Sequence, residues 1–244
     1  MHPILFELGP LRFYSYGLLI ALGFLAASAL AARRAAAAGL DPGKIQGVAL
    51  TALLAGLAGG RIAYVLLRWD LFRDNPVEIL RLDHGGLVFF GGLAGGLLGG
   101  VWAIRRAGMP LARTVDLLIP PLVLAHAFGR IGCLLNGCCY GKFTSLPWGI
   151  RFPGEELRRH PTQLYEALAL LAIFFLLKRL ERRAPRPGTV LLAYGLSYAL
   201  WRFFVEFLRA DNPPIALGLT IFQWISVGVA LVSGILLIRR ERER

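Results

Sequence analysis

Long apolar runs dominate the chain. Seven stretches of mainly hydrophobic residues, most of them close to 20 residues long, alternate with shorter polar segments. A helix needs about 20 consecutive apolar residues to cross the hydrocarbon core of a bilayer. The pattern therefore predicts seven transmembrane helices. The candidate spans are residues 14–32, 46–67, 86–104, 115–131, 162–177, 189–208 and 219–238.

The composition agrees with this pattern. The chain has 244 residues, of which 56% are hydrophobic, and a mean hydropathy of +0.59. A soluble protein of this size seldom hides that much apolar surface. We expect no cleavable signal peptide, because no basic segment precedes the first run and further spans follow it. The sequence predicts an all-α, polytopic integral membrane protein with a single membrane-embedded domain over residues 1–244.

The positive charge is unevenly distributed between the two sets of connecting segments. A net charge of +12 could indicate nucleic-acid binding. However, one set of segments holds fifteen basic and four acidic residues, whereas the other holds nine basic and eight acidic residues. The positive-inside rule makes the first side cytoplasmic, with the N-terminus outside and the C-terminus inside. We therefore expect membrane lipids as partners and no nucleic acid. The longer outer segments, 68–85 and 132–161, predict a small periplasmic head.

Glycines crowd the second and third predicted spans, in "GLAGGR" and "GGLVFFGGLAGGLLGG". Small residues at this spacing let helices approach closely in lipid. Composition favours helix packing as their role and leaves a functional role open.

Ionisable residues inside predicted spans are the strongest functional signal. Such residues are costly in a membrane and indicate a functional site or a buried pair. Near the end of the sixth span, Tyr198, Arg202, Glu206 and Arg209 follow at steps of four, four and three, so they share one helix face. The stripe is either an ion pair that ties helices together or the lining of a cavity that opens outward. The six ionisable residues in or at the ends of spans are Arg61, Asp116, Arg130, Glu166, Arg202 and Glu206.

Arg130 lies at the outer end of the fourth span. Asp116, near the cytoplasmic end, is about 21 Å away along a straight helix, so the two cannot pair. We expect Asp116 to act as a cap or as a partner of Arg113, and Glu206 or a bound anion to neutralise Arg130. Guanidinium groups grip phosphate in two places. Arginines near the outer leaflet with few acids to match them therefore indicate a phospholipid site.

All three cysteines lie close together, at positions 133, 138 and 139. A disulfide between Cys133 and either Cys138 or Cys139, or simple packing at a helix end, is the favoured interpretation. Their spacing matches no common zinc motif, so we predict no metal site. Three histidines, His84, His126 and His160, could serve as a base, although a purely hydrogen-bonded role is more common.

Six motifs together resemble those of the prolipoprotein diacylglyceryl transferase family. "GRIGCLLNGCCYG" is similar to the family signature G-R-x-G-N-F-x-N-G-E-x-x-G. "YSYGLLIALGF", "GGRIAYV", "GGLVFFGG", "RHPTQLYE" and "YALWRFFVEFLRAD" fall in the same order as in the family. The resemblance covers nearly the whole chain.

The resemblance implies a reaction and a location. Members of the family transfer the diacylglyceryl group of phosphatidylglycerol to the lipobox cysteine thiol in the signal peptide of a prolipoprotein, forming a thioether and releasing glycerol phosphate. This is the first step of bacterial lipoprotein maturation. It implies a multi-pass protein of the bacterial inner membrane with its active site toward the outer leaflet, and no soluble cofactor or metal. The acceptor thiol belongs to the substrate.

The resemblance also assigns residues. Arg130 matches the arginine that holds the phosphatidylglycerol head, and Arg202 matches the essential arginine of the sixth span. We predict four catalytic residues: Arg130, Arg202, Tyr198 and Glu206. We predict eight substrate-binding residues: Arg130, Tyr16, Arg61, Asn136, His160, Gln163, Tyr165 and Arg209.

Three of the departures from the family pattern concern polar or ionisable positions. Cys133 and Cys138 stand at an asparagine and a glutamate of the signature, and Phe90 stands where well-studied members carry a histidine. Either that histidine is dispensable, or Glu206 or His84 replaces it, or the chain is a divergent relative that binds or modifies another lipid or thiol. Besides a lipid transferase and a divergent relative, a small anion transporter is a third possible function. However, the paired broken segments typical of transporters are not evident.

Overall fold

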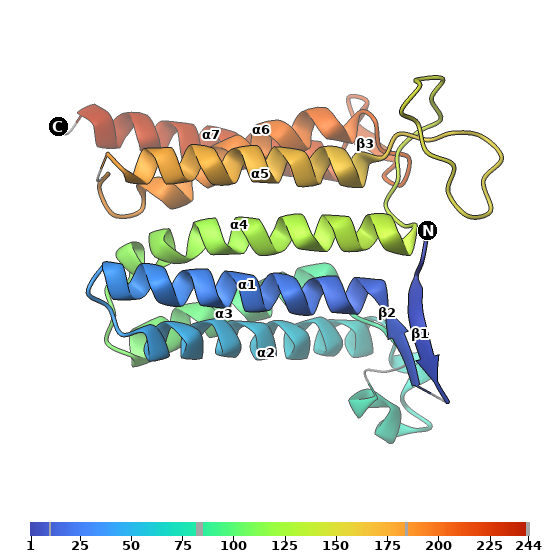
Figure 1. Cartoon of the computed structure of the whole chain (residues 1–244), viewed down its shortest axis with the longest axis horizontal. Helices are drawn as coiled ribbons and strands as arrows, with labels where there is room; N and C mark the ends of the chain where they lie inside the picture. Colours follow the sequence, from blue (N-terminus) through green and yellow to red (C-terminus); the bar gives the residue numbers. More distant parts are fainter. Residues whose placement is uncertain (10, 82–84, 184, 243–244) are drawn as a thin grey trace. The chain divides into compact units, whose positions relative to one another are not determined.

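The computed structural model describes residues 1–9, 11–81, 85–183 and 185–242. Seven α-helices lie within these residues, each overlapping one predicted span (Figure 1). They are α1 (Ser15–Ala37), α2 (Pro42–Leu67), α3 (Phe89–Arg106), α4 (Leu111–Asn136), α5 (Thr162–Glu181), α6 (Thr189–Glu206) and α7 (Ile221–Arg242). The prediction of a mainly helical protein is confirmed.

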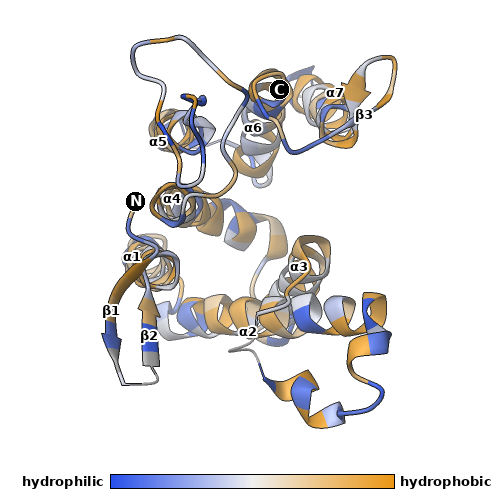
Figure 2. Cartoon of the chain, turned by 90° about the vertical axis from the view of Figure 1, so that its right-hand side faces the viewer, coloured by the Kyte–Doolittle hydropathy of each residue, from blue (hydrophilic) through white to orange (hydrophobic). Residues whose placement is uncertain are grey.

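Four helices, α1, α2, α4 and α7, are long and apolar enough to cross a membrane by length and composition. Much of their apolar surface faces outward, since only 17% of the most apolar part of α2 and of α7 is buried. Figure 2 shows hydrophobic residues along the helices and many of the hydrophilic ones in the connecting segments. Contiguous exposed apolar surface of this kind marks a membrane contact. The full count of seven spans, the orientation of the termini, the periplasmic head and the single domain stay predictions.

The chain forms two compact units, Met1–Ala29 with Val115–Arg244, and Leu30–Thr114. In the second unit, α2 packs directly on α3 through glycines. A Cβ at Gly91 would lie 2.5 Å from the carbonyl oxygen of Gly59, and one at Gly59 would lie closer still to the carbonyl oxygen of Gly91. Both helices therefore need glycine where their backbones meet, and the packing role favoured by composition is confirmed.

Helix α2 begins at a local cap. Asp41 precedes it in extended conformation, and its Oδ1 accepts hydrogen bonds from the backbone N–H groups of Gly43 (2.8 Å) and Lys44 (3.4 Å). Pro42 occupies the first helical position, where a missing N–H costs nothing. Two short 3₁₀ helices, η1 (Trp69–Leu71) and η2 (Pro76–Leu80), follow α2.

The first unit contains two small antiparallel hairpins that the hydrophobic pattern did not predict. The pair β1 (Ile4–Leu8) and β2 (Leu11–Tyr14) precedes α1, and β3 (Pro214–Ala216) and β4 (Leu219–Thr220) connect α6 to α7. Leu217 and Gly218 turn the second hairpin with φ of 51° and 73°. Two successive positive φ values are typical of the two-residue turns that suit twisted strands.

In the first unit, α6 and α7 pack side by side (Figures 1 and 2). A Cβ added at Gly195 of α6 would lie 2.7 Å from the hydroxyl oxygen of Ser233 on α7. Asp116, near the start of α4, accepts hydrogen bonds from the backbone N–H groups of Gly188 (2.5 Å) and Leu191 (2.9 Å). The predicted cap is thus confirmed, but Asp116 caps the distant helix α6 rather than its own. Arg113 instead donates to the carbonyl oxygen of Ala38.

Candidate active site

The centre of the candidate site is Glu166, a fully buried carboxylate on α5. Its Oε1 lies 2.9 Å from Nη2 of Arg130 on α4, and its Oε2 lies 4.0 Å from Nη1 of Arg202 on α6. The hydroxyl of Tyr198, one turn before Arg202, donates a 2.7 Å hydrogen bond to Glu166. A carboxylate from one helix thus joins polar side chains of two others.

A second buried carboxylate, Glu206, continues the chain of charges. Its Oε2 lies 2.7 Å from Nη2 of Arg202 and 3.8 Å from Nε of Arg209. Its Oε1 accepts hydrogen bonds from Asn212 (2.7 Å) and from the hydroxyl of Thr220 (2.9 Å). Charges therefore alternate in the order arginine, glutamate, arginine, glutamate, arginine. We call these five residues the charge network: Arg130, Glu166, Arg202, Glu206 and Arg209.

The structure brings together the four residues that the sequence placed on one helix face, but Arg209 lies beyond the end of α6, in a β-bridge with Gly141, so its place on that face is corrected. The predicted i, i+4 ion pair of Arg202 with Glu206 is confirmed. The expected counter-charge of Arg130 is corrected, because Glu166 provides it rather than Glu206. Sequence reasoning left Glu166 out of the site. Two features of the sequence could have indicated Glu166: it is an acidic residue in an apolar span, and it is the last residue of the motif "RHPTQLYE".

Two arginine donors in the network lack a hydrogen-bond partner. Nη1 of Arg202 and Nη1 of Arg209 are both buried and unpaired by hydrogen-bond geometry. Arg209 otherwise pairs with Asp211, whose Oδ1 lies 2.9 Å from its Nε. Buried polar groups are nearly always satisfied, so these two donors could bind an anion, although Oε2 of Glu166, 4.0 Å from Nη1 of Arg202, also lacks a hydrogen-bond partner.

Aromatic and imidazole rings flank the network. Nε2 of His126 accepts a 3.4 Å hydrogen bond from Nε of Arg130. The His126 ring meets that of Tyr198 edge to face at 5.3 Å, and Tyr194 stacks on Tyr198 at 5.7 Å. These rings hold Tyr198 in place for its bond to Glu166.

Several predicted substrate-binding residues gather where α4 ends and α5 begins. Tyr16 of α1 packs on Gly132, where an added Cβ would lie 3.1 Å from its ring. Asn136 is the last residue of α4. Nδ1 of His160 lies 3.3 Å from the hydroxyl of Tyr165, which also accepts a hydrogen bond from the indole N–H of Trp148 at 2.8 Å. These side chains form the polar surroundings of the end of α4, and their substrate contacts stay predictions.

Gln163 has a different environment. It is fully buried, and its Nε2 donates to the carbonyl oxygen of Cys138. Its Oε1 has no hydrogen-bond partner. The geometry shows Gln163 holding the chain after α4, and a substrate role is not required to explain it.

Arg61 lies in the other unit, where backbone carbonyls surround its guanidinium. Its five N–H donors face the carbonyl oxygens of five residues and leave none free. The rings of Tyr64 and Phe72 lie within 5.8 Å of the guanidinium carbon. Arg61 therefore orders the segment after α2, and direct contact with substrate would require it to release a bond. The five acceptors belong to Glu78, Ile79, Arg81, Gly85 and Gly86. The candidate base His84 lies outside the described residues.

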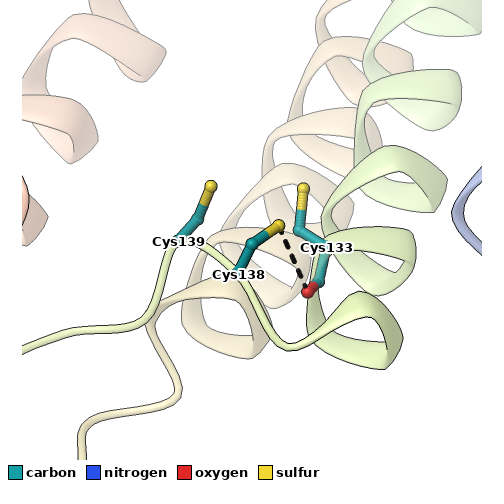
Figure 3. A group of neighbouring side chains, drawn as sticks. All are labelled: Cys133, Cys138 and Cys139. Atoms are coloured by element: carbon teal, nitrogen blue, oxygen red, sulfur yellow. Dashed lines mark hydrogen bonds between the residues drawn. The ribbon is translucent and has the colours of Figure 1, made fainter. Parts of the chain in front are cut away.

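The three cysteines are free and cluster at the end of α4 (Figure 3). Their sulfur atoms all lie within 4.8 Å of one another. Hydrogen bonds with the thiols of Cys133 and Cys138 lower the pKa of Cys139, and the positive charges of Arg209 and Arg130 lower it further. The expected disulfide is not formed.

The loop between α4 and α5 has its own ion pair. Arg159 donates a 2.8 Å bond to Glu155 and lies over the rings of Tyr140 and Phe143, at 4.9 and 3.9 Å. The hydrogen bond from Arg159 lowers the pKa of Glu155. The loop is also tied to the end of α6, because the N–H of Lys142 donates to the carbonyl oxygen of Leu208 at 2.7 Å.

Apolar helices that bury a network of arginines and glutamates define a class, a multi-pass membrane protein with a charged internal site. The sequence profile of the prolipoprotein diacylglyceryl transferase family matches residues 3–239. The chain belongs to this family and is a membrane transferase.

Individual relatives agree over nearly the full length. A phosphatidylglycerol–prolipoprotein diacylglyceryl transferase of Clostridium tetani is 35% identical over 249 residues, covering 100% of this chain and 99% of the relative. The enzyme of the same name from Nitratidesulfovibrio vulgaris (strain DP4) is 39% identical over 236 residues, covering 94% and 88%. That of Pasteurella multocida is 35% identical over 241 residues, covering 97% and 88%.

Proposed function

We propose that this chain transfers the diacylglyceryl group of phosphatidylglycerol to the lipobox cysteine of prolipoproteins, the first step of lipoprotein maturation. Family membership and the full-length relatives of that name support this activity. The same comparisons do not favour the divergent relative or the anion transporter that the sequence left open.

One observation in the structure carries the proposal. Nη1 of Arg202 and Nη1 of Arg209 are buried donors without a hydrogen-bond partner, in a site whose three arginines face the carboxylates of Glu166, Glu206 and Asp211. A lipid phosphate would supply acceptors for both donors. Arginine suits this task, since its donors form a fixed fork that matches phosphate oxygens.

The proposed reaction is a displacement at the lipid's glyceryl carbon. The substrate sulfur attacks the carbon that carries the phosphate ester, so a C–S bond forms as the C–O bond breaks. The electron pair of the C–O bond leaves with glycerol phosphate, and the proton of the thiol ends on the released phosphate or on a base. Negative charge develops on the leaving oxygen, where preorganised guanidinium groups stabilise it best. We assign this role to Arg130 and Arg202.

The carboxylates position these arginines. Both oxygens of Glu206 face donors or cations, so we assign it to holding Arg202 and Arg209 in place. Glu166 likewise holds Arg130, Arg202 and the Tyr198 hydroxyl. We infer that the thiol is activated by the field of the arginines and the bound phosphate, without a dedicated histidine.

The surroundings of the network bind the rest of the substrate in this proposal. Tyr16, Asn136, His160 and Tyr165 lie around the end of α4, where the head group or the lipobox peptide would approach. Gln163 shapes this region through the backbone of Cys138. Arg61 would contribute to substrate binding only indirectly, through the segment after α2 that it orders.

A transfer assay tests the proposal. Purified protein is mixed with labelled phosphatidylglycerol and a lipobox peptide, and thioether-linked diacylglycerol on the peptide is measured. We expect Arg202→Ala to lower the rate by about 100-fold or more, as does loss of one charge-stabilising donor in other enzymes. The matched control is Arg239→Ala, because Arg239 is an exposed arginine at the end of α7. Full transfer by Arg202→Ala would overturn the role of the arginines.

The same assay separates the alternatives. Lipid that binds without transfer would favour a divergent relative. We expect Cys133→Asn and Cys138→Glu to keep transferring, because the acceptor thiol belongs to the peptide.

We also propose that the protein lies in the bacterial inner membrane as seven spans, with the N-terminus outside, the C-terminus inside and the active site toward the outer leaflet. The excess of basic residues on one set of connecting segments supports this orientation. When a reporter is fused to the C-terminus, we expect its activity to be found on the cytoplasmic side of the membrane. Activity on the outer side would reverse the orientation.

A further inference from the structure

The thiol cluster at the end of α4 has no part in the proposed transfer. Cys133, Cys138 and Cys139 are the only cysteines of the chain, and two of them stand where it departs from the family signature. In Figure 3 the three sulfur atoms point to the same side of the chain as it leaves the helix. Their placement has a definite structural origin.

The end of α4 brings the first two thiols together. The N–H of Cys138 donates to the carbonyl oxygen of Cys133, and the N–H of Gly137 donates to that of Leu134, both at 3.1 Å. Gly137 has a φ of 73°. These features form a Schellman motif, which folds the chain back over the last helical turn. Cys138 therefore returns to Cys133, five residues earlier.

Helix α5 fixes the remaining geometry. The hydroxyl of Thr162 donates to the carbonyl oxygen of Cys139 at 2.8 Å, and Gln163 donates to that of Cys138. Both side chains are fully buried, so these anchors are rigid. Cys139 has a φ of 63°, a left-handed conformation that costs energy for a residue with a side chain. The fold thus maintains a strained backbone at the residue that completes the cluster.

The spacing of the sulfurs suits a shared metal ion. With metal–sulfur bonds of about 2.3 Å, a trigonal arrangement places sulfurs about 4 Å apart. The three sulfurs, all within 4.8 Å of one another, need only small shifts to reach that geometry. A disulfide needs a sulfur–sulfur bond of about 2.05 Å and leaves one thiol over.

The ligand set selects the kind of metal. Among the described residues, the cluster contains three thiols and no histidine or carboxylate. Structural zinc sites almost always have four ligands, whereas soft thiolates without a fourth donor suit Cu(I). Three thiolates around a monovalent ion are negatively charged overall, and Arg209 and Arg130 place positive charge near Cys139. The surroundings therefore favour the loaded form.

We propose that Cys133, Cys138 and Cys139 form a three-thiolate site for one soft, thiophilic metal ion of the Cu(I) type. The site revises the expectation from sequence spacing that the chain binds no metal. Its ligands are distinct from the charge network, whose Arg130 and Arg209 contribute only positive charge near Cys139.

Competition for Cu(I) tests the site. The full chain, reduced and purified in detergent, is titrated with Cu(I) held by the coloured chelator bicinchoninate. We expect the chain to withdraw one Cu(I) per molecule and to protect all three thiols from alkylation by N-ethylmaleimide, counted by mass spectrometry. Each of Cys133→Ser, Cys138→Ser and Cys139→Ser should weaken Cu(I) binding by at least about tenfold, the loss seen even for outer-shell partners of metal sites.

Controls keep the test decisive. Met109→Leu removes a sulfur outside the cluster and should bind Cu(I) like the native chain. Unchanged thermal unfolding of the serine variants would show that they remain folded. If a serine variant does not fold, the protection that Cu(I) gives the native chain's three thiols against alkylation tests the site instead. The proposal fails if bicinchoninate keeps the copper, or if the native chain retains Zn(II) in preference to Cu(I). It also fails if only one cysteine is alkylated in protein prepared without reductant, which would reveal a disulfide.

Discussion

The substitution Glu166→Gln tests the centre of the charge network, because it removes one negative charge and keeps the shape of the side chain. Glu166 is fully buried, 2.9 Å from Arg130 and 4.0 Å from Arg202. Glutamine can still accept the hydrogen bond of Tyr198, so the expected loss of stability comes mainly from the missing negative charge. Unit charges 4 Å apart attract by about 4 kcal/mol at an effective dielectric of about 20. Breaking a buried ion pair costs about 3–5 kcal/mol.

We expect the free energy of unfolding to fall by about 3 kcal/mol, near the lower end of this range, because Arg202 keeps Glu206 as a partner. For a chain of this length each kcal/mol shifts Tm by about 2–4 °C, so Tm should fall by about 6–12 °C. The five tryptophans provide the fluorescence signal for thermal unfolding in detergent. The control Glu156→Gln, at an exposed loop position, should shift Tm by less than about 2 °C.

A double-mutant cycle isolates the pair itself. If Arg130 and Glu166 interact as the structure shows, Arg130→Gln combined with Glu166→Gln should destabilise the protein by less than the sum of the two single changes. Strictly additive changes, or a Glu166→Gln protein that melts like the native one, would refute the reasoning.

Three further predictions concern local structure. Gly91→Ala should lower stability by about 1–3 kcal/mol because its Cβ would meet the facing helix, whereas Gly47→Ala, with open space around it, should be neutral or slightly stabilising in the same melting assay. Asp41→Ala should cost about 0.5–2 kcal/mol by removing the cap of α2, and an equal loss in Asp41→Asn would argue against capping. The pKa of Glu155 is lowered by Arg159, so its contribution is present above the unfolded pKa of about 4.3 and is lost as pH falls through the lower folded pKa. Hydrogen exchange of this loop should therefore speed up below about pH 4 in the native chain but not in Glu155→Gln, and equal pH dependence in both would exclude the pair as its cause.

The helices could be predicted from the sequence because their cause is local. Apolar runs of sufficient length form helices wherever the chain meets lipid, and all seven predicted spans overlap a helix. Their ends were less predictable. Helix α4 continues to Asn136, five residues beyond the predicted span, because the glycine motif at Gly137 rather than hydropathy ends it. The hairpins β1–β2 and β3–β4 escaped detection since their strands have only two to five residues.

The candidate site was half predictable. The face shared by Tyr198, Arg202 and Glu206 follows from helical periodicity, and the structure confirms it. The role of Glu166 does not follow, since it lies 32 residues from Tyr198 and on another helix. The sequence could show that Arg130 needed a counter-charge, but not which carboxylate would provide it.

By itself the sequence determined which residues form apolar helices, which charges those helices carry and to which family the chain belongs. These properties depend on neighbours along the chain and on the cost of placing charge in lipid. Only the tertiary structure decided that Glu166 joins Arg130 to Arg202, that Asp116 caps α6, and that three thiols share one small space. Those contacts join segments far apart in sequence or depend on the exact turn at a helix end, and local pattern encodes neither.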